Sequence, residues 1–146
     1  IFHPLSGCSL KGKWGENMFN ALLLAEKEKN VRFISEDEHC AVLSAYAPRT
    51  AFEVWVILKK DKSSLSSCSE VEISSLAKNL HETLMKLYTR VKIDTLNVVV
   101  HQLPRVDDVF RLHVEILPFK HLAGAERGFG EFAIEVTPEK VAEVLR

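Results

Sequence analysis

The sequence lacks the features that mark extracellular, membrane-spanning and nucleic-acid-binding proteins. Its three cysteines, Cys8, Cys40 and Cys68, form no Cys-x-x-Cys pair, which excludes a disulfide framework and a cysteine-rich zinc site. Apolar runs such as Ala21–Ala25 and Val98–Val100 are far shorter than the roughly 20 residues needed to cross a bilayer. The 19 basic and 20 acidic residues leave a formal charge of −1, so no sequence-wide positive field attracts a phosphate backbone. We therefore expect no membrane or nucleic-acid partner, and a reducing, cytoplasmic setting.

What the sequence does contain is the composition of one compact domain. Its 146 residues are 47% hydrophobic and 27% charged, which is ordinary for a folded domain. It has no internal repeat, and its one biased stretch, the serine-rich segment 59–69, is typical of an exposed connection. We expect a single domain over 1–146. The chain begins at Ile1 rather than methionine and ends on a helical pattern, which indicates a fragment or a trimmed chain.

Periodic apolar positions predict three helices. Residues 17–29 form a short amphipathic pattern that ends in a charged run. Ser69 and Glu72 match a capping box, and the apolar residues that follow recur at steps of three and four, which predicts a long helix over 70–91. The pair Thr137-Pro138 offers an N-cap and a first helical residue, and it predicts a terminal helix.

Six segments carry strand signals, namely β-branched and aromatic residues between turn residues. They are 31–35, 40–46, 52–59, 96–102, 109–117 and 130–136. The first three are typical of a meander, and the fourth and fifth are joined by the loop Leu-Pro-Arg-Val-Asp-Asp. Short connections interrupted by one long helix predict an α+β fold, with an antiparallel sheet of five to six strands and helices packed on one face.

The predicted strand over 109–117 alternates between polar and apolar side chains. Arg111, His113 and Glu115 point to one face, and the residues that alternate with them point to the other: Phe110, Leu112, Val114 and Ile116. If the strand over 96–102 pairs beside it, Asn97 and His101 join the polar face. Two histidines and a carboxylate then converge on one surface.

Three interpretations of this cluster remain open from the pattern alone. In the first, His113 is a catalytic nucleophile that attacks an α-phosphate, while Arg111 and Asn97 bind the substrate. In the second, His101, His113 and Glu115 hold zinc or iron, with a fourth ligand from elsewhere. In the third, they are solvated side chains on the wet face of a sheet.

The segment Arg111-Leu-His113-Val-Glu115-Ile-Leu-Pro118 resembles the signature strand of the histidine-triad superfamily. That signature alternates His-φ-His-φ-His (or Gln), and its middle histidine is the nucleophile. More closely, the chain resembles the C-terminal half of galactose-1-phosphate uridylyltransferases, from about Cys8 onward. Further segments agree with that half in order: Ala47-Pro48-Arg49, Phe52-Glu53-Val54-Trp55, Leu96-Asn97, His101-Gln-Leu-Pro104, Ala123-Gly-Ala-Glu126 and Thr137-Pro138-Glu139.

The resemblance implies a histidine-triad-like fold and a part in moving UMP between a UDP-hexose and a hexose 1-phosphate. The family's catalytic His-Pro-His-Gly-Gln strand lies in its N-terminal domain, and nothing in this chain matches it. The implied role is support of a cleft for a nucleotide sugar or sugar phosphate, against a missing N-terminal domain or within a homodimer. By position, His101, His113 and Glu115 fall on strands that supply the ligands of a structural metal in some members.

Two departures from the signature bear on the nucleophile interpretation. Arg111 stands where the first histidine belongs, and Glu115 stands where the third residue is His or Gln. Two anions about 4 Å apart repel by roughly 1 kcal/mol in water and by several kcal/mol at lower dielectric, which argues against phosphoryl chemistry at His113. An ion pair between Arg111 and Glu115 would give both side chains a purely structural role. The alternative function is a stand-alone module that dimerises and binds a nucleotide or a metal.

Overall fold

The computed structural model describes residues 18–103, 110–119 and 132–146. The described helices are α2 (Met18–Lys29), α3 (Glu70–Lys86) and α5 (Pro138–Leu145), together with the short turns η1 (Leu65–Ser67) and η2 (Leu87–Val91). The described strands are β1 (Phe33–Glu36), β2 (Cys40–Ser44), β3 (Val54–Leu58), β4 (Leu96–His101) and β5 (His113–Pro118). The predicted α+β class is confirmed. Part of the predicted β4–β5 loop and the segment 123–126 lie outside the described residues.

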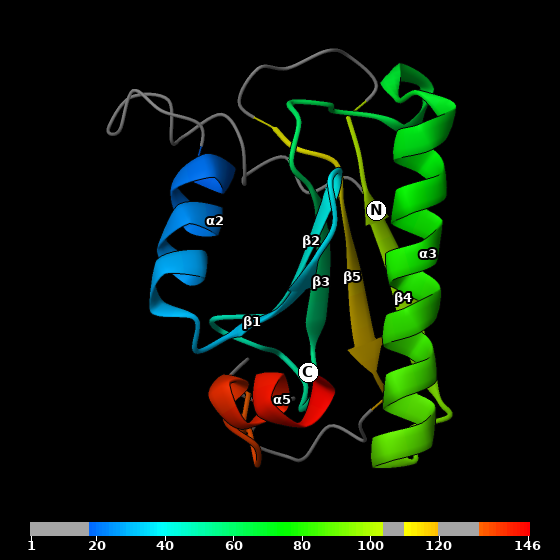
Figure 1. Ribbon diagram of the computed structural model, residues 1–146. Coiled ribbons are helices and arrows are strands. Elements are labelled where there is room, and N and C mark those ends of the chain that lie inside the picture. The colour runs from blue at the N-terminus through cyan, green and yellow to red at the C-terminus, as the bar shows by residue number, and fades with distance from the viewer. Residues whose placement is uncertain (1–17, 104–109, 120–131) are drawn as a thin grey trace.

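The five strands form one antiparallel sheet in the order β1-β2-β3-β5-β4 (Figure 1). The first three strands are the expected meander, and β5 lies between β3 and β4. The sixth strand predicted over 130–136 is wrong for its described part, because residues 132–136 hold no strand. The apolar residues that alternate in this segment do not share one buried face. Val136 packs against the core just before α5, whereas Phe132 is exposed.

Helix α3 begins and ends as its sequence predicts. The Ser69 backbone N–H donates to the Glu72 carboxylate at 2.8 Å, and the Ser69 hydroxyl accepts from the Glu72 backbone N–H at 3.4 Å. This is the predicted capping box. The helix continues to Val91, but its last turn widens into the π-helical turn η2, which closes on Lys92 in the left-handed conformation.

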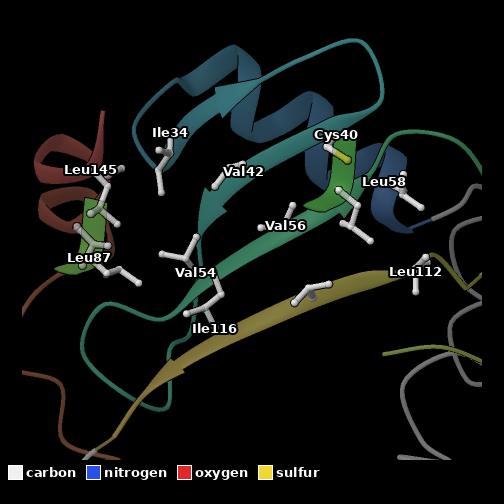
Figure 2. Close-up of a cluster of buried hydrophobic side chains, with 14 residues drawn as sticks. Ile34, Cys40, Val42, Val54, Val56, Leu58, Leu87, Leu112, Ile116 and Leu145 are labelled. Atoms are coloured by element: carbon white, nitrogen blue, oxygen red, sulfur yellow. The ribbon is translucent and has the colours of Figure 1, made fainter. Parts of the chain in front are cut away.

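The main core lies between one face of the sheet and the helices α3 and α5. Alternate residues of β2, β3 and β5 point to this face because successive side chains in a strand point to opposite sides. Figure 2 shows ten labelled residues of the cluster, from the strands and from the elements that pack on them: Ile34, Cys40, Val42, Val54, Val56, Leu58, Leu87, Leu112, Ile116 and Leu145.

A second, smaller core covers the opposite face. Phe19 of α2 packs there against Leu43 and Ile57, so α2 and α3 lie on opposite sides of the sheet (Figure 1). Helices on one face were expected, and this holds for α3 and α5 but not for α2. The reason is in the strands: nearly every residue of β2 and β3 is buried, so both faces of the central strands need cover.

Two of the three cysteines lie among the described residues. Cys40 and Cys68 are free thiols, and burial raises the pKa of the Cys40 thiol to about 11, which leaves it protonated near neutral pH. Cys8 lies outside the described residues. Among the helices that the structure describes, none has the length and apolar character required to cross a membrane.

Asp37 ties the β1–β2 turn to α3. Its carboxylate accepts hydrogen bonds from the backbone N–H groups of His39 and Cys40, at 2.9 and 2.8 Å. It also accepts from the side chains of Ser75 and Asn79, each at 2.7 Å. Burial opposes ionisation, but these hydrogen bonds together outweigh it and lower the pKa of Asp37 from 3.8 to about 2.

We expect Asp37→Ala to lower the free energy of unfolding by about 3 kcal/mol near neutral pH, because hydrogen bonds to a charged group contribute roughly 1.5–3 kcal/mol each. The folded pKa lies below the unfolded one, so the contribution is complete above about pH 4 and is lost as the pH falls towards about 2. Urea unfolding at about pH 6 and about pH 2 measures both effects. The exposed neighbour Glu38 provides the control Glu38→Ala. A wild-type difference between the two pH values in Asp37→Ala would contradict this account.

Candidate functional site

The β4–β5 pairing brings two histidines face to face. His101 is the direct register partner of His113. Their rings stack with centroids 4.7 Å apart and planes 5° apart, so both lie on the same face of the sheet. The convergence predicted from the alternation pattern is confirmed.

His113 is almost fully enclosed by aromatic rings. Its exposed fraction is 7%, and the ring centroids of Phe19, Trp55 and Phe110 lie 5.1, 5.5 and 5.7 Å from its own. Phe110 was expected on the core face with Leu112, but it precedes the first residue of β5, and the strand alternation does not reach it. The predicted open, wet face is thus covered by α2 around His113.

The protonation of the His113 ring is fixed by its surroundings. Burial lowers the pKa of His113 to about 4, so the ring is neutral near pH 7. Its Nδ1 atom lies 2.8 Å from the backbone carbonyl oxygen of Arg111. A carbonyl can only accept a hydrogen bond, so Nδ1 carries the proton and Nε2 keeps a free lone pair.

Glu115 completes the cluster from the same face of β5. One carboxylate oxygen, Oε2, lies 2.9 Å from His101 Nε2 and also forms an ion pair with the guanidinium of Arg49. Burial opposes ionisation of Glu115, but the contacts with His101 and Arg49 outweigh it and leave the pKa of the carboxyl below its ordinary value. His101 Nε2 is buried and lacks a well-aligned hydrogen-bond partner despite its short distance to the carboxylate.

Arg49 and Glu53 belong to this cluster, and the sequence argument missed both. The Arg49 backbone N–H donates to the Glu53 carboxylate at 2.6 Å, and Trp55 Nε1 donates to the same group at 3.0 Å. With the histidines counted as neutral, one guanidinium faces two carboxylates, Glu53 and Glu115, and the cluster carries a formal charge of −1. Such a site attracts a cation and repels a phosphate.

Arg111 has a different role from either one predicted. Its side chain is 1% exposed; it forms an ion pair with Asp61 and donates to Asn20 Oδ1 of α2 at 2.6 Å. It therefore does not neutralise Glu115, and its guanidinium is not presented to a ligand. The cause is local: the backbone beside Arg111 is held against the chain segment that follows β3, where Leu112 N–H donates to the Lys62 carbonyl at 2.6 Å.

Asn97 lies on the same face of β4 as His101 but at the far end of the strand. Its register partner is Leu117, whereas the partner of His101 is His113. Four residues along a strand correspond to about 13 Å. Asn97 is exposed there, and the structure does not bring it to the histidine cluster.

The cluster contains the residue types that hold transition metals in proteins. One ligand atom from each of His101, His113 and Glu115 lies within 4.8 Å of the other two, and two imidazoles with a carboxylate suit zinc or iron. The free lone pair of His113 Nε2 is available to such an ion, whereas His101 Nε2 already faces the Glu115 carboxylate at 2.9 Å. The hydrogen bond from His113 Nδ1 to a carbonyl is the usual support for a metal-ligating imidazole.

Comparison with known proteins finds one family model and several solved structures that this chain resembles. The family model described as "Scavenger mRNA decapping enzyme C-term binding" matches residues 16–127. A solved uridylyltransferase mutant superposes with a TM-score of 0.83 at 26% identity, over 92% of this chain and 47% of that one. An ADP-glucose phosphorylase from Arabidopsis thaliana, with bound ADP-glucose, superposes with a TM-score of 0.77 at 24% identity, over 93% and 44%.

A zinc-bound histidine-triad family protein from Mycobacterium smegmatis superposes with a TM-score of 0.61 at 18% identity, over 86% of this chain and 89% of that one. The predicted histidine-triad-like fold is confirmed. The chain spans about half the length of the uridylyltransferase and the phosphorylase. A search of curated protein sequences finds no match.

We expect Arg111→Ala to lower the free energy of unfolding by about 2–4 kcal/mol, because it removes a buried side chain, an ion pair and a hydrogen bond to α2. Thermal and urea unfolding measure the change. The matched control is Arg90→Ala, an exposed arginine with one hydrogen bond to Val144, which we expect to change stability by less than about 1 kcal/mol. Wild-type stability of Arg111→Ala would contradict this structural role of the guanidinium.

Proposed function

Because this chain belongs to the family of the scavenger mRNA decapping enzyme C-terminal binding domain, we propose that it is the non-nucleophilic half of a nucleotidyltransferase acting on nucleotide sugars. The reaction we assign to the whole enzyme is UMP transfer between a UDP-hexose and a hexose 1-phosphate, as in galactose-1-phosphate uridylyltransferases. The structural neighbours named as a uridylyltransferase and as an ADP-glucose phosphorylase with bound ADP-glucose support this assignment. Each is about twice as long as this chain, which leaves room for the half that carries the nucleophile.

The observation that carries the proposal is the environment of His113. A histidine nucleophile has to reach a phosphorus atom, and its neighbours have to tolerate the phosphate charge. His113 is buried under aromatic rings, and the nearby carboxylate of Glu115 is only partly neutralised. At an effective dielectric near 20, a phosphate about 4 Å from a carboxylate is repelled by roughly 4 kcal/mol. This half therefore supports the reaction without forming the nucleotidyl-histidine.

We assign a structural zinc or iron ion to His101, His113 and Glu115. His101 Nε2, His113 Nε2 and a carboxylate oxygen of Glu115 would hold it, and a fourth ligand would come from elsewhere. When bound, the ion would supply positive charge to a cluster that carries a formal charge of −1. The Arg49 guanidinium holds one carboxylate oxygen and so orients Glu115 towards the histidines. The zinc-bound histidine-triad neighbour supports a metal in this fold.

The edge strand β4 is the surface that we assign to the partner domain. Among the strands that the structure describes, it has one neighbour, β5, and its Val98 and Val100 side chains are each 41% exposed. An edge strand with exposed apolar residues offers both backbone hydrogen bonds and apolar surface to a partner. We propose that a domain carrying His-Pro-His, or a second copy of this chain, docks there in the cytoplasm.

A stand-alone module is the second candidate function. The zinc-bound histidine-triad neighbour is a small protein, and this chain covers 89% of it. In this case the chain dimerises and binds a nucleotide or a metal without a catalytic partner. The two candidates differ in whether a partner with His-Pro-His restores transfer.

We expect the purified chain to contain about one zinc or iron ion, or to take up one on reconstitution. His101→Ala and Glu115→Ala each remove one ligand and should lower the affinity by about tenfold or more. His81→Ala, which changes an exposed histidine on α3, is the matched control and should retain the metal. Elemental analysis and metal titration measure the content. Absence of binding by the wild-type chain, even with added Zn²⁺ and Fe²⁺, would eliminate the metal site.

We expect the chain alone to show no uridylyl transfer, and co-expression with a fragment carrying His-Pro-His to restore it. UDP-glucose labelled in its α-phosphate would then mark the partner fragment as a covalent nucleotidyl intermediate and leave this chain unlabelled. The label should persist when the partner is combined with His113→Ala. Label on this chain that is lost in His113→Ala would make His113 the nucleophile and overturn the proposal.

A further inference from the structure

A pocket lies at the end of the β4–β5 ladder away from the histidines. Its volume is about 450 Å³, which is in the range of small-molecule sites. The β2–β3 loop, the link between η2 and β4, the end of β5 and Glu135 converge on it. Leu96 pairs with Pro118 at this end of the ladder, and His101 pairs with His113 at the other. Five residues separate the two ends, or about 17 Å.

The backbone around this pocket is strained at two positions. Phe52 and Lys92 both line it, and both have a φ of 63°. Among the described residues, the remaining non-glycine with positive φ is Asn30, and asparagine tolerates this conformation, whereas a bulky phenylalanine does not. Lys92 also closes the π-helical turn η2, a rare geometry that is frequent at functional sites. Strain of this kind gathers at ligand sites, where the surrounding structure maintains it.

The pocket carries charges of both signs that do not neutralise one another. Lys92, Asp94 and Glu135 line it and are exposed, and none of them forms an ion pair with another residue in the part of the chain that the structure describes. The remaining wall is largely apolar and includes Phe52 and Phe119.

These features select the class of ligand. A simple anion would meet two carboxylates, and a simple cation would meet the ammonium of Lys92. A zwitterion with an apolar body complements both charges and the aromatic wall.

We propose that this pocket binds a free α-amino acid with an apolar or aromatic side chain. The ligand ammonium lies between Asp94 and Glu135, and the ligand carboxylate pairs with Lys92. The ligand side chain packs on Phe52 and Phe119, which contribute apolar area and ring stacking. This inference does not rest on the nucleotidyltransferase assignment, because the pocket shares no residue with the histidine cluster.

The test compares three ligands that differ by one charge each: phenylalanine, phenethylamine without the carboxylate, and 3-phenylpropionate without the ammonium. Calorimetric titration of the full chain should show saturable binding of phenylalanine, at least tenfold tighter than of the other two. Amide chemical shifts should move at residues 50–52 and 92–95. Lys92→Gly removes the ammonium and relieves the left-handed strain, so it keeps the fold. It should bind phenylalanine no more tightly than phenethylamine.

Asp94→Asn should weaken the binding of phenylalanine by about tenfold. Phe132 is exposed and lies outside the pocket, so Phe132→Ala should leave this binding unchanged. Equal binding of the three ligands, unchanged affinity in Lys92→Gly, or no saturable binding of phenylalanine would overturn the proposal. Preferential binding of UMP or glucose at residues 92–95 would overturn the assignment of the pocket to an amino acid. Metal content and uridylyl transfer report on the histidine cluster at the other end of the ladder. Absence of metal binding or of uridylyl transfer would therefore leave the amino-acid titration unaffected.

Discussion

The register of the β4–β5 ladder is the constraint on which the histidine cluster depends. Because His101 pairs directly with His113, the two rings stack, and the carboxylate of Glu115 on the same face comes within 2.9 Å of His101 Nε2. A slip of one residue would turn every side chain of one strand to the opposite face. The buried apolar residues of β5 hold the register, since a slip would turn them away from the core.

The surroundings of the cluster decide its chemistry. Aromatic rings from α2, from β3 and from Phe110 ahead of β5 cover His113, and the hydrogen bond to the Arg111 carbonyl leaves a lone pair on Nε2. The excess of carboxylate charge around Arg49 favours a cation over a phosphate. A buried, neutral imidazole beside a carboxylate supports our proposal that this half holds a metal ion or a partner domain and does not attack a nucleotide. This agrees with a chain that spans about half of the uridylyltransferase structure it resembles.

Local patterns predicted much of the fold and half of the site. The capping box at Ser69, the Thr137-Pro138 helix start and the alternation around His113 act over a few residues, so the sequence alone reveals them. The pairing of Arg49 with Glu115 and of Arg111 with Asp61 spans many residues and depends on how loops meet strand ends. The position of α2 on the second face follows from burial of β2 and β3 on both sides, which short apolar runs do not distinguish from a half-exposed sheet. The left-handed backbone of Phe52 leaves no signal in the sequence, because that residue type disfavours it.

The tautomer of His113 tests the central claim most directly. Long-range ¹H–¹⁵N correlation spectra of the labelled, metal-free chain near neutral pH distinguish a ring that carries its proton on Nδ1 from one that carries it on Nε2. The account predicts a neutral ring protonated on Nδ1, with the unprotonated Nε2 responding to added Zn²⁺. A ring protonated on Nε2, or protonated on both nitrogens near neutral pH, would contradict the arrangement of His101, His113 and Glu115 described above.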